Sequence, residues 1–396
     1  MKYAILIGDG MADYPLAELG GRTPLEEAHT PNMDYIAHSG IGGLVKTIPD
    51  SRPPGSDVAN LEILGYDTTV HYTGRAPLEA AGMGIILGSD DVAFRCNLVT
   101  CQDGKLVDYS AGHISTLEAS ELIQLLSDRL GTERVKFYPG VSYRHLVVIK
   151  DGPERLSTTP PHDITGQQID EHLPQGEGQE LIRRLMFNSV DILNRAEVNR
   201  RRLSQGKLPA NMIWLWGQGR SLRLPSIGER FGLAGGVISA VDLVKGIGMA
   251  AGLRVIDVPG ATGYLDTNYS GKAQYALDAL RELDLVYLHV EAPDEAAHSA
   301  DLRAKLQAIE QFDHLVVAKI LEGLSSLGQF RIMILPDHRT PLTVRTHTRE
   351  PVPVAIFSAN TTPDDMLAFT ETEAEKGSLR IERGHQLIRQ FIDLEE

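Results

Sequence analysis

Near its N-terminus the chain reads Tyr3-Ala4-Ile5-Leu6-Ile7-Gly8-Asp9-Gly10. The almost wholly apolar run at 3–7 predicts a buried strand, and the Gly-Asp-Gly that follows predicts a loop at its carboxyl end. Apolar runs of similar character predict further buried strands at 212–216, 285–290, 332–335 and 352–358. Helical patterns lie between the later runs, at 242–251, 271–282 and 301–324. Strands that alternate with helices predict an α/β fold with a mostly parallel sheet flanked by helices.

Polar side chains follow three of these predicted strands directly. Asp9 follows the first strand, residues 291–298 follow the strand at 285–290, and Asp337 with His338 follows the strand at 332–335. Because the carboxyl ends of parallel strands lie at one edge of a sheet, these three segments are expected to converge. The sequence therefore predicts a functional site at that edge.

The middle of the chain has a different pattern. Short strand patterns at 92–100, 105–109 and 145–150 surround a helical pattern at 116–130. Proline and glycine clusters then precede another helical pattern at 179–203. We therefore expect a smaller inserted α+β domain at 93–205, and a discontinuous core domain formed by 1–92 and 206–396.

The charge and the cysteine content exclude several classes of protein. The 396 residues include 38 Lys and Arg against 53 Asp and Glu, a formal net charge of −15. A net negative surface repels phosphate backbones and anionic lipid, so neither a nucleic acid nor a membrane is expected as a partner. Two cysteines, Cys96 and Cys101, are too few for a disulfide scaffold or a cysteine zinc cluster. Because no signal-peptide core and no long apolar window is found, we expect a cytoplasmic protein.

Metal-ligating residue types recur at the predicted strand ends. Asp294 and His298 stand four residues apart, a spacing that places both side chains on one face of a helix or turn. Asp337 and His338 are adjacent, and His347 follows a little later. Carboxylate oxygens together with imidazole nitrogens suit manganese, zinc, cobalt or magnesium. A lone histidine is usually an ordinary hydrogen-bonding residue, whereas this combination predicts a metal site.

The segment Pro54-Gly55-Ser56-Asp57 contains a candidate nucleophile, Ser56. Gly55 permits close approach of a ligand to the backbone, and Ser56 lies at the predicted N-terminus of a helix. Backbone N–H groups and the helix dipole favour a phosphate at such a position. A serine oxygen beside a metal ion can ionise and attack. From this segment alone, a serine that merely caps the helix is the simpler interpretation.

Several motifs together resemble those of one family. In chain order they are Gly8-Asp9-Gly10-Met11, Pro54-Gly55-Ser56-Asp57, Asp294 with His298, Asp337-His338 and His347. This order is similar to that of the alkaline phosphatase superfamily, and within it the chain resembles the archaeal-type, cofactor-independent phosphoglycerate mutases. The likeness extends to 94–97, 139–145, 159–163, 214–217 and 242–246, and it covers essentially the whole chain.

The resemblance implies an alkaline-phosphatase-like core, two divalent metal ions and no organic cofactor. It assigns the ligands to two sets, namely Asp9, Ser56, Asp337 and His338 for one ion, and Asp294, His298 and His347 for the other. Ser56 would attack the substrate phosphate and carry a phosphoserine intermediate. The implied function is a metal-dependent phosphoglycerate mutase of glycolysis and gluconeogenesis that interconverts 3-phosphoglycerate and 2-phosphoglycerate. The inserted domain would close the cleft over this small phosphorylated metabolite.

A cleft that binds phosphate and carboxylate also needs positively charged side chains. The candidates are Arg95, Arg144 and Lys245, with His145 and His162 in addition. Each of these residues fits a surface ion pair equally well.

The chain departs from the mutase pattern at 108–114, where Tyr, Ser and His stand in place of the arginines usual in the family. Guanidinium groups bind carboxylate and phosphate through paired hydrogen bonds, which these replacements do not form. The variant looks like a bacterial subgroup with a proposed homoserine kinase role. Three alternatives stay open: a phosphotransferase acting on another small alcohol such as homoserine, a phosphomonoesterase with the same centre, and a non-catalytic binding protein. The sequence leaves the oligomeric state undetermined.

Overall fold

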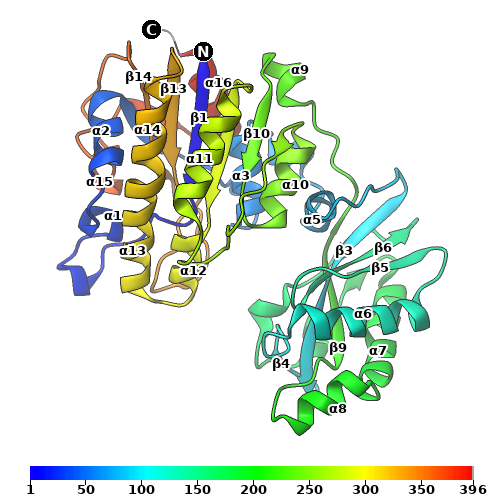
Figure 1. The fold of residues 1–396 in the computed structure, drawn as a ribbon. Helices are drawn as coiled ribbons and strands as arrows, with labels where there is room; N and C mark the ends of the chain where they lie inside the picture. The colour runs from blue at the N-terminus through cyan, green and yellow to red at the C-terminus, as the bar shows by residue number, and fades with distance from the viewer. Residues whose placement is uncertain (395–396) are drawn as a thin grey trace. The chain divides into compact units, whose positions relative to one another are not determined.

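The computed structural model describes residues 1–394, which form two compact units (Figure 1). Unit 1 comprises Met1–Tyr72 together with the chain from Arg223 onward, and unit 2 comprises Thr73–Leu222. The chain therefore leaves unit 1 once and returns to it. The boundaries expected at 92/93 and 205/206 both fall inside unit 2, so the inserted unit is longer at each end than expected.

Unit 1 is built around an eight-stranded sheet with the order β11-β10-β12-β1-β13-β14-β2-β15. Its strands are β1 (Lys2–Gly8), β2 (Ile41–Val45), β10 (Gly235–Ile238), β11 (Arg254–Val255), β12 (Leu285–Val290), β13 (Phe330–Leu335), β14 (Val352–Ser358) and β15 (Leu379–Ile381). Neighbouring strands are parallel except at β14, which runs antiparallel to both β13 and β2. The prediction of a mostly parallel sheet is confirmed.

Strand β1 lies in the middle of this sheet and is buried on both sides. It pairs with β12 and β13, so that Ile5 lies opposite Tyr287 on one side and Met333 on the other. Ile5, Leu6 and Ile7 are fully buried. Removing each such side chain from water stabilises the fold by about 1.5–3 kcal/mol, which explains why the apolar run at 3–7 forms a central strand.

Helices pack around the sheet of unit 1, and α11 lies beside α14 (Figure 1). The helices are α1 (Pro24–Glu27), α2 (Pro31–Ser39), α3 (Ser56–Ile63), α4 (Thr68–His71), α9 (Ile227–Phe231), α10 (Asp242–Ala250), α11 (Tyr269–Leu280), α12 (Ala292–His298), α13 (Leu302–Phe312), α14 (Ala318–Ser325), α15 (Glu371–Ala374) and α16 (Leu387–Asp393). Short helical turns are η1 (Ala17–Leu19), η4 (Asp313–Val317) and η5 (Gly384–Gln386). Among residues 1–394, no helix combines the length and the apolarity needed to cross a bilayer.

The single helix expected at 301–324 is interrupted by η4, a π-helical turn between α13 and α14. The buried Asp313 at this turn accepts hydrogen bonds from the backbone N–H groups of Asn32 (3.1 Å) and Met33 (2.7 Å). Asp313 thereby satisfies donors at the start of α2, which a helix cannot pair internally. The π-helical turn therefore coincides with a contact between distant parts of the chain, and an amphipathic pattern does not reveal it.

Unit 2 contains a five-stranded antiparallel sheet with the order β4-β3-β6-β5, and β9 pairs with β3. The strands of unit 2 are β3 (Asp91–Gln102), β4 (Lys105–Asp108), β5 (Val135–Tyr138), β6 (Arg144–Lys150) and β9 (Met212–Gly219), with a separate pair, β7 (Leu156–Ser157) and β8 (Gln175–Gly176). Its helices are α5 (Ala76–Gly82), α6 (Thr116–Leu130), α7 (Gln179–Asn194) and α8 (Glu197–Ser204), with the turns η2 (Pro161–Ile164) and η3 (Ile169–His172). This unit is the expected α+β domain.

The strand expected at 212–216 belongs to unit 2, which corrects its expected place in the core domain. It is part of β9, and its Trp216 lies opposite Arg95 of β3. A short buried strand has the same apolar pattern in either sheet, so the pattern alone does not assign it. Because side chains alternate along a strand, β3 directs Phe94 and Cys96 to the core of unit 2, while Arg95 faces the opposite side.

Candidate active site and metal centre

Three segments of unit 1 meet at the carboxyl edge of the parallel sheet. Asp9 directly follows β1, Asp337 follows β13 after one intervening residue, and α12 follows β12 in the same way. The backbone N–H of Gly10 donates a hydrogen bond to Asp337 Oδ1 (3.2 Å), which joins the first two segments. The structure thus brings together the segments that the sequence predicted to converge.

Asp294, His298 and His347 form one group of ligand atoms that lie within 4.8 Å of one another. Asp294 and His298 are one turn apart on α12, and His298 Nε2 lies 3.0 Å from Asp294 Oδ2. His347 Nε2 lies 3.1 Å from His298 Nε2 and 3.5 Å from Asp294 Oδ1. Two imidazole nitrogens and a carboxylate that converge in this way fit a shared cation.

Asp9, Asp337 and His338 form a second group, next to Ser56. His338 Nε2 lies 3.5 Å from Asp9 Oδ1, 3.5 Å from Asp337 Oδ2 and 3.0 Å from Ser56 Oγ. Asp9 Oδ1 is buried and has no hydrogen-bond partner within the described chain. Leaving a buried oxygen unpaired costs free energy unless another group binds it. Asp9 and His338 also lie within 4.8 Å of Asp294, so the two groups adjoin.

The electrostatics of these groups favour bound cations. Burial and the neighbouring Asp337 carboxylate raise the pKa of Asp9 well above its usual range. Burial lowers the pKa of His338 to about 4, so the ring is neutral, which is the form that ligates metals. Burial alone would lower the pKa of His298, but the Asp294 carboxylate outweighs burial and raises the pKa to about 9. The donor atoms, the unpaired oxygen of Asp9 and the concentration of buried carboxylates all fit divalent metal ions.

Ser56 is the first residue of α3 and follows Gly55. Asn60, one turn further along α3, donates from Nδ2 to Ser56 O (2.8 Å) and to Asp337 Oδ2 (2.9 Å). The Tyr287 hydroxyl donates in turn to Asn60 Oδ1. These contacts hold the first turn of α3 against the candidate metal-ligating carboxylate of Asp337. The unpaired N–H groups at the start of a helix favour an anion there.

Gly10 allows the loop after β1 to approach α12 closely. Its φ of +60° is unfavourable for other residues, and a Cβ atom at this position would lie 2.6 Å from Asp294 Oδ1 and 2.6 Å from Thr340 Oγ1. The Thr340 hydroxyl itself donates to Asp294 Oδ1 (2.5 Å). The glycine is therefore required by the geometry of the metal groups and not only by the turn.

Arg95 and His162, two of the predicted substrate residues, lie next to Trp216 on one face of the unit 2 sheet. The guanidinium carbon of Arg95 lies 4.2 Å from the ring centroid of Trp216, and its Nε lies 2.8 Å from Glu79 Oε2. Burial lowers the pKa of Arg95 to about 10, which still leaves the side chain charged at neutral pH. The rings of Trp216 and His162 lie edge to face, with centroids 5.5 Å apart.

A series of ring contacts continues from His162 to Arg144. His162 and Tyr109 have ring centroids 6.1 Å apart, and Tyr109 and Tyr143 have centroids 5.6 Å apart. The guanidinium of Arg144 lies 4.6 Å from the ring centroid of Tyr143. We call this set the aromatic–arginine face; its members are Arg95, Trp216, His162, Tyr109, Tyr143 and Arg144. It carries a guanidinium at each end, which suits an anionic ligand.

His145 and Lys245 differ from the expected substrate-facing cations. His145 is buried, and its Nδ1 accepts a hydrogen bond from the backbone N–H of Gly140 (3.0 Å). Burial lowers the pKa of His145 to about 3, so the ring is neutral at neutral pH, and its assignment to the substrate site stays a prediction. Lys245 lies on α10 in unit 1 and pairs through Nζ with Asp257 Oδ1 at 2.7 Å. Its observed contact is the ion pair that the sequence left as the alternative.

Comparisons with known proteins identify the family. A family model described as 2,3-bisphosphoglycerate-independent phosphoglycerate mutase matches residues 37–199. A curated protein from Geobacter sulfurreducens, named as a probable mutase of this kind, is 54% identical over 99% of this chain and 100% of its own length. A Methanosarcina acetivorans protein with the same enzyme name is 53% identical over 99% of this chain and 100% of its own. The chain belongs to the 2,3-bisphosphoglycerate-independent phosphoglycerate mutase family. The family expected from the sequence is confirmed.

Solved structures share the fold of this mutase family member. The PH0037 protein from Pyrococcus horikoshii has a TM-score of 0.84 and 31% identity, covering 99% of this chain and 97% of that chain. The cofactor-independent phosphoglycerate mutase from Thermoplasma acidophilum has a TM-score of 0.66 and 27% identity, covering 100% of both chains. The expected fold class, an α/β core with a smaller inserted α+β part, is therefore confirmed.

Sequence reasoning missed several residues that surround the candidate metal groups of this family member. Asn60 and Thr340 hold Asp337 and Asp294 directly through side-chain hydrogen bonds. His289 forms a third group with Asp9 and Asp337, again within 4.8 Å. The available signal for His289 was a single imidazole inside the otherwise apolar run at 285–290.

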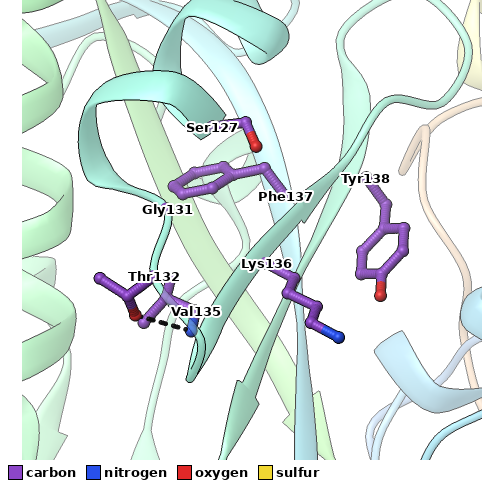
Figure 2. A pocket seen from close by; sticks show the side chains of 7 residues that line it. All are labelled: Ser127, Gly131, Thr132, Val135, Lys136, Phe137 and Tyr138. Carbon is purple, nitrogen blue, oxygen red and sulfur yellow. Dashed lines mark hydrogen bonds between the residues drawn. The ribbon is translucent and has the colours of Figure 1, made fainter.

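A hollow of about 410 Å³ on unit 2 contains none of the predicted site residues of the mutase family member (Figure 2). It is lined by Ser127, Gly131, Thr132, Val135, Lys136, Phe137 and Tyr138. The Thr132 hydroxyl within it accepts a hydrogen bond from the backbone N–H of Val135 (3.1 Å). Lys136 is the one charged residue of this lining, so the aromatic–arginine face is better suited to a multiply charged anion.

Proposed function

We propose that this protein interconverts 3-phosphoglycerate and 2-phosphoglycerate through a phosphoserine intermediate on Ser56. The observation that carries the proposal is the 3.0 Å separation of Ser56 Oγ from His338 Nε2, beside two groups of converging carboxylates and imidazoles. A serine that only caps a helix does not require carboxylates and imidazoles around its hydroxyl. The enzyme names of the curated relatives support the same reaction.

The proposed centre holds two divalent ions, with manganese, zinc, cobalt and magnesium as the candidates. The first set of ligands is Asp9, Ser56, Asp337 and His338, and the second set is Asp294, His298 and His347. Such ions, when bound, lower the pKa of a coordinated hydroxyl and neutralise the charge on phosphate oxygens.

The proposed reaction consists of two displacements at phosphorus. First, Ser56 Oγ loses its proton and forms a bond to phosphorus, while the bond from phosphorus to the C3 oxygen breaks and that oxygen gains a proton. Then the C2 hydroxyl loses its proton and attacks the phosphoserine, and Ser56 Oγ leaves and regains a proton. The N–H groups at the start of α3 stabilise the negative charge on the phosphoryl oxygens in both steps.

We further propose that the aromatic–arginine face binds anionic groups of the substrate. The support is that Arg95 is held rigidly between the Glu79 carboxylate and the ring of Trp216, and a fixed guanidinium loses little entropy on binding an anion. Arg144, at the other end, is positioned by its contact with Tyr143. The ligand is a small phosphorylated metabolite.

We place this activity in the cytoplasm. The support is that Cys96 and Cys101 are both free thiols, as is usual in a reducing compartment. Burial raises the pKa of Cys101 to about 12, so this thiol stays protonated and unreactive at neutral pH.

Phosphorus NMR tests the proposed function directly. The metal-free protein is incubated with Mn²⁺ and 3-phosphoglycerate, and Ser56→Ala serves as the control. Conversion to 2-phosphoglycerate without free phosphate supports the mutase. Release of inorganic phosphate instead identifies a phosphomonoesterase. Phosphorylation of Ser56 with no formation of 2-phosphoglycerate indicates another acceptor alcohol, and homoserine is the first to test.

A further inference from the structure

His289 is a fully buried imidazole within the apolar strand β12. Its Nε2 lies 3.5 Å from Asp9 Oδ2 and 3.7 Å from Asp337 Oδ2. Both ring nitrogens lack a hydrogen-bond partner within residues 1–394. Burying a polar ring without hydrogen-bond partners costs free energy. The position of His289 between two buried carboxylates therefore needs a physical reason.

The other side of the ring faces a buried ion pair. His289 Nδ1 lies 3.5 Å from Glu291 Oε1, and Lys272 Nζ donates to Glu291 Oε2 at 2.6 Å. Glu291 Oε1 also accepts hydrogen bonds from the Ser239 hydroxyl (2.6 Å) and from the backbone N–H of Ala240 (2.7 Å). The position of Glu291 is therefore determined by three donors.

Lys272 has no solvent-exposed side-chain surface, so its pairing with Glu291 is a fully desolvated one. Its Nζ also donates to the backbone carbonyl of His289 at 2.9 Å. Replacing a buried ion pair with apolar residues is often neutral or stabilising, so stability alone is a weak reason for this arrangement. The arrangement does, however, hold the backbone carbonyl of His289 and place the Glu291 carboxylate beside its ring.

We propose that His289 is a positioning residue of the metal centre, oriented by Glu291 and Lys272 so that its Nε2 side restrains the carboxylates of Asp9 and Asp337. The inference rests on the proposed function, because it assigns a role toward the proposed metal ions. A hydrogen-bond donor beside a ligating carboxylate fixes which oxygen turns toward the metal. The residue itself contacts neither substrate nor the reacting atoms.

The effect should be confined to one of the two metal groups. Asp294 is held separately, by the hydroxyl of Thr340. The Thr340 carbonyl accepts a hydrogen bond from Lys305 Nζ (2.9 Å), and that lysine also pairs with the buried Asp13 (2.7 Å). Asp294 is therefore held through Thr340 and the buried Lys305, and none of these contacts involves His289.

Calorimetric titration of the metal-free, full-length chain with Mn²⁺ tests the inference. The wild-type chain is expected to bind two equivalents. In His289→Leu, one equivalent should bind about 10–100-fold more weakly, as is typical when a residue that orients a metal ligand is removed. The second equivalent should bind with unchanged affinity. His172→Gln is the control, because His172 lies in unit 2, where its Nε2 is 2.9 Å from Gln167 Oε1, and it belongs to none of the groups in the described chain that could hold a metal ion; it should bind like wild type.

A pair of amide variants keeps the test decisive if His289→Leu does not fold, as judged by circular dichroism. The amide nitrogen of Gln falls near the position of Nε2, whereas that of Asn falls near Nδ1. His289→Gln should therefore retain most of the Mn²⁺ affinity, and His289→Asn should lose it. Equal affinities in both variants, or two unweakened equivalents in His289→Leu, overturn the inference. A wild-type chain that binds no Mn²⁺ overturns the proposed function as well.

Discussion

The side-chain oxygen of Ser56 lies 3.0 Å from Nε2 of His338, although 282 positions separate the two residues in the chain. Asn60 ties the first turn of α3 to the carboxylate of Asp337 beside this contact. The serine is thereby held beside candidate ligands that follow β1 and β13. This relationship supports the proposal that Ser56 is a nucleophile and not a simple helix cap.

Ser56→Ala should abolish phosphoryl transfer. Because the variant lacks the oxygen that would carry the phosphoryl group, we expect kcat to fall by at least about 1,000-fold. The measurement is the rate of 2-phosphoglycerate formation, together with mass spectrometry for a phosphoserine. Ser226→Ala is the control, because Ser226 caps α9 without contacting the metal groups, and its activity should be unchanged. Undiminished activity of Ser56→Ala would refute the phosphoserine mechanism.

Asp294→Asn should remove one metal equivalent. Asp294 is the only carboxylate in the group with His298 and His347, and burial would otherwise disfavour its charge, yet these two imidazoles hold its pKa well below the usual range. The amide has no charge to attract a cation, so elemental analysis should show one bound divalent ion per chain in place of two. Asp364→Asn, a loop carboxylate elsewhere in unit 1, should keep both. An unchanged metal content in Asp294→Asn would contradict the assignment.

Gly10→Ala should weaken both folding and metal binding. A non-glycine residue at φ +60° costs about 1–3 kcal/mol, and the added Cβ would displace the Asp294 carboxylate. Gly20→Ala is the matched control, because Gly20 has φ +66° but no atom within 4 Å of the added Cβ. Denaturant unfolding should show a loss of stability in both variants, whereas Mn²⁺ titration should show weakened binding in Gly10→Ala alone. Equal Mn²⁺ affinities in the two variants would exclude the close approach as the cause.

Arg144→Met should raise KM and leave the metal content unchanged. A charge-assisted hydrogen bond is worth about 1.5–3 kcal/mol, which corresponds to an increase in KM of about 10–150-fold. Steady-state kinetics with 3-phosphoglycerate measures this effect. Arg134→Met removes an exposed arginine of unit 2 outside the aromatic–arginine face and should behave as wild type. Equal KM values for both variants would remove Arg144 from the substrate site.

Unit 2 should lose stability on mild acidification because of His145. Its pKa is about 3 in the folded protein and about 6.5 when the chain is unfolded. Between pH 3 and pH 6.5, His145 is therefore protonated in the unfolded state but neutral in the folded state. Stability is unaffected above pH 6.5 and falls by up to about 1.4 kcal/mol per pH unit below it.

Tryptophan fluorescence during urea unfolding isolates this effect, because the chain has two tryptophans, Trp214 and Trp216, and both belong to unit 2. His145→Gln should show a shallower loss of stability between pH 7 and pH 5 than wild type. The same slope in both proteins would show that another group is responsible.

The apolar runs predicted much of the unit 1 sheet but not the assignment of every strand. The run at 285–290 coincides with β12, and the run at 3–7 falls one residue short of β1 at each end. The run at 212–216 was placed in the wrong domain because burial on both faces looks the same in either sheet. The helix expected at 179–203 is broken between α7 and α8 at Arg195 and Ala196, where no proline or glycine marks the end.

The candidate metal ligands were found because carboxylates and histidines at strand ends are conspicuous in an apolar context. Asn60, Thr340 and His289 were missed because their importance depends on side-chain contacts between distant segments, which no spacing reveals. The roles assigned to the ligands, to Ser56 and to His145 are predictions, and the burial of His145 could not be predicted from its residue type alone.

The central position of β1 has a cost during synthesis. Ribosomes make this strand first, yet the strands on either side of it begin at Leu285 and Phe330. At about 5–20 residues per second, roughly 15–65 s pass before both neighbours exist. Unit 2 is contiguous in the chain and is complete within that interval, whereas β1 has neither neighbouring strand until β12 and β13 are made. We therefore expect newly made chains to need shielding by a chaperone until β12 and β13 have been made.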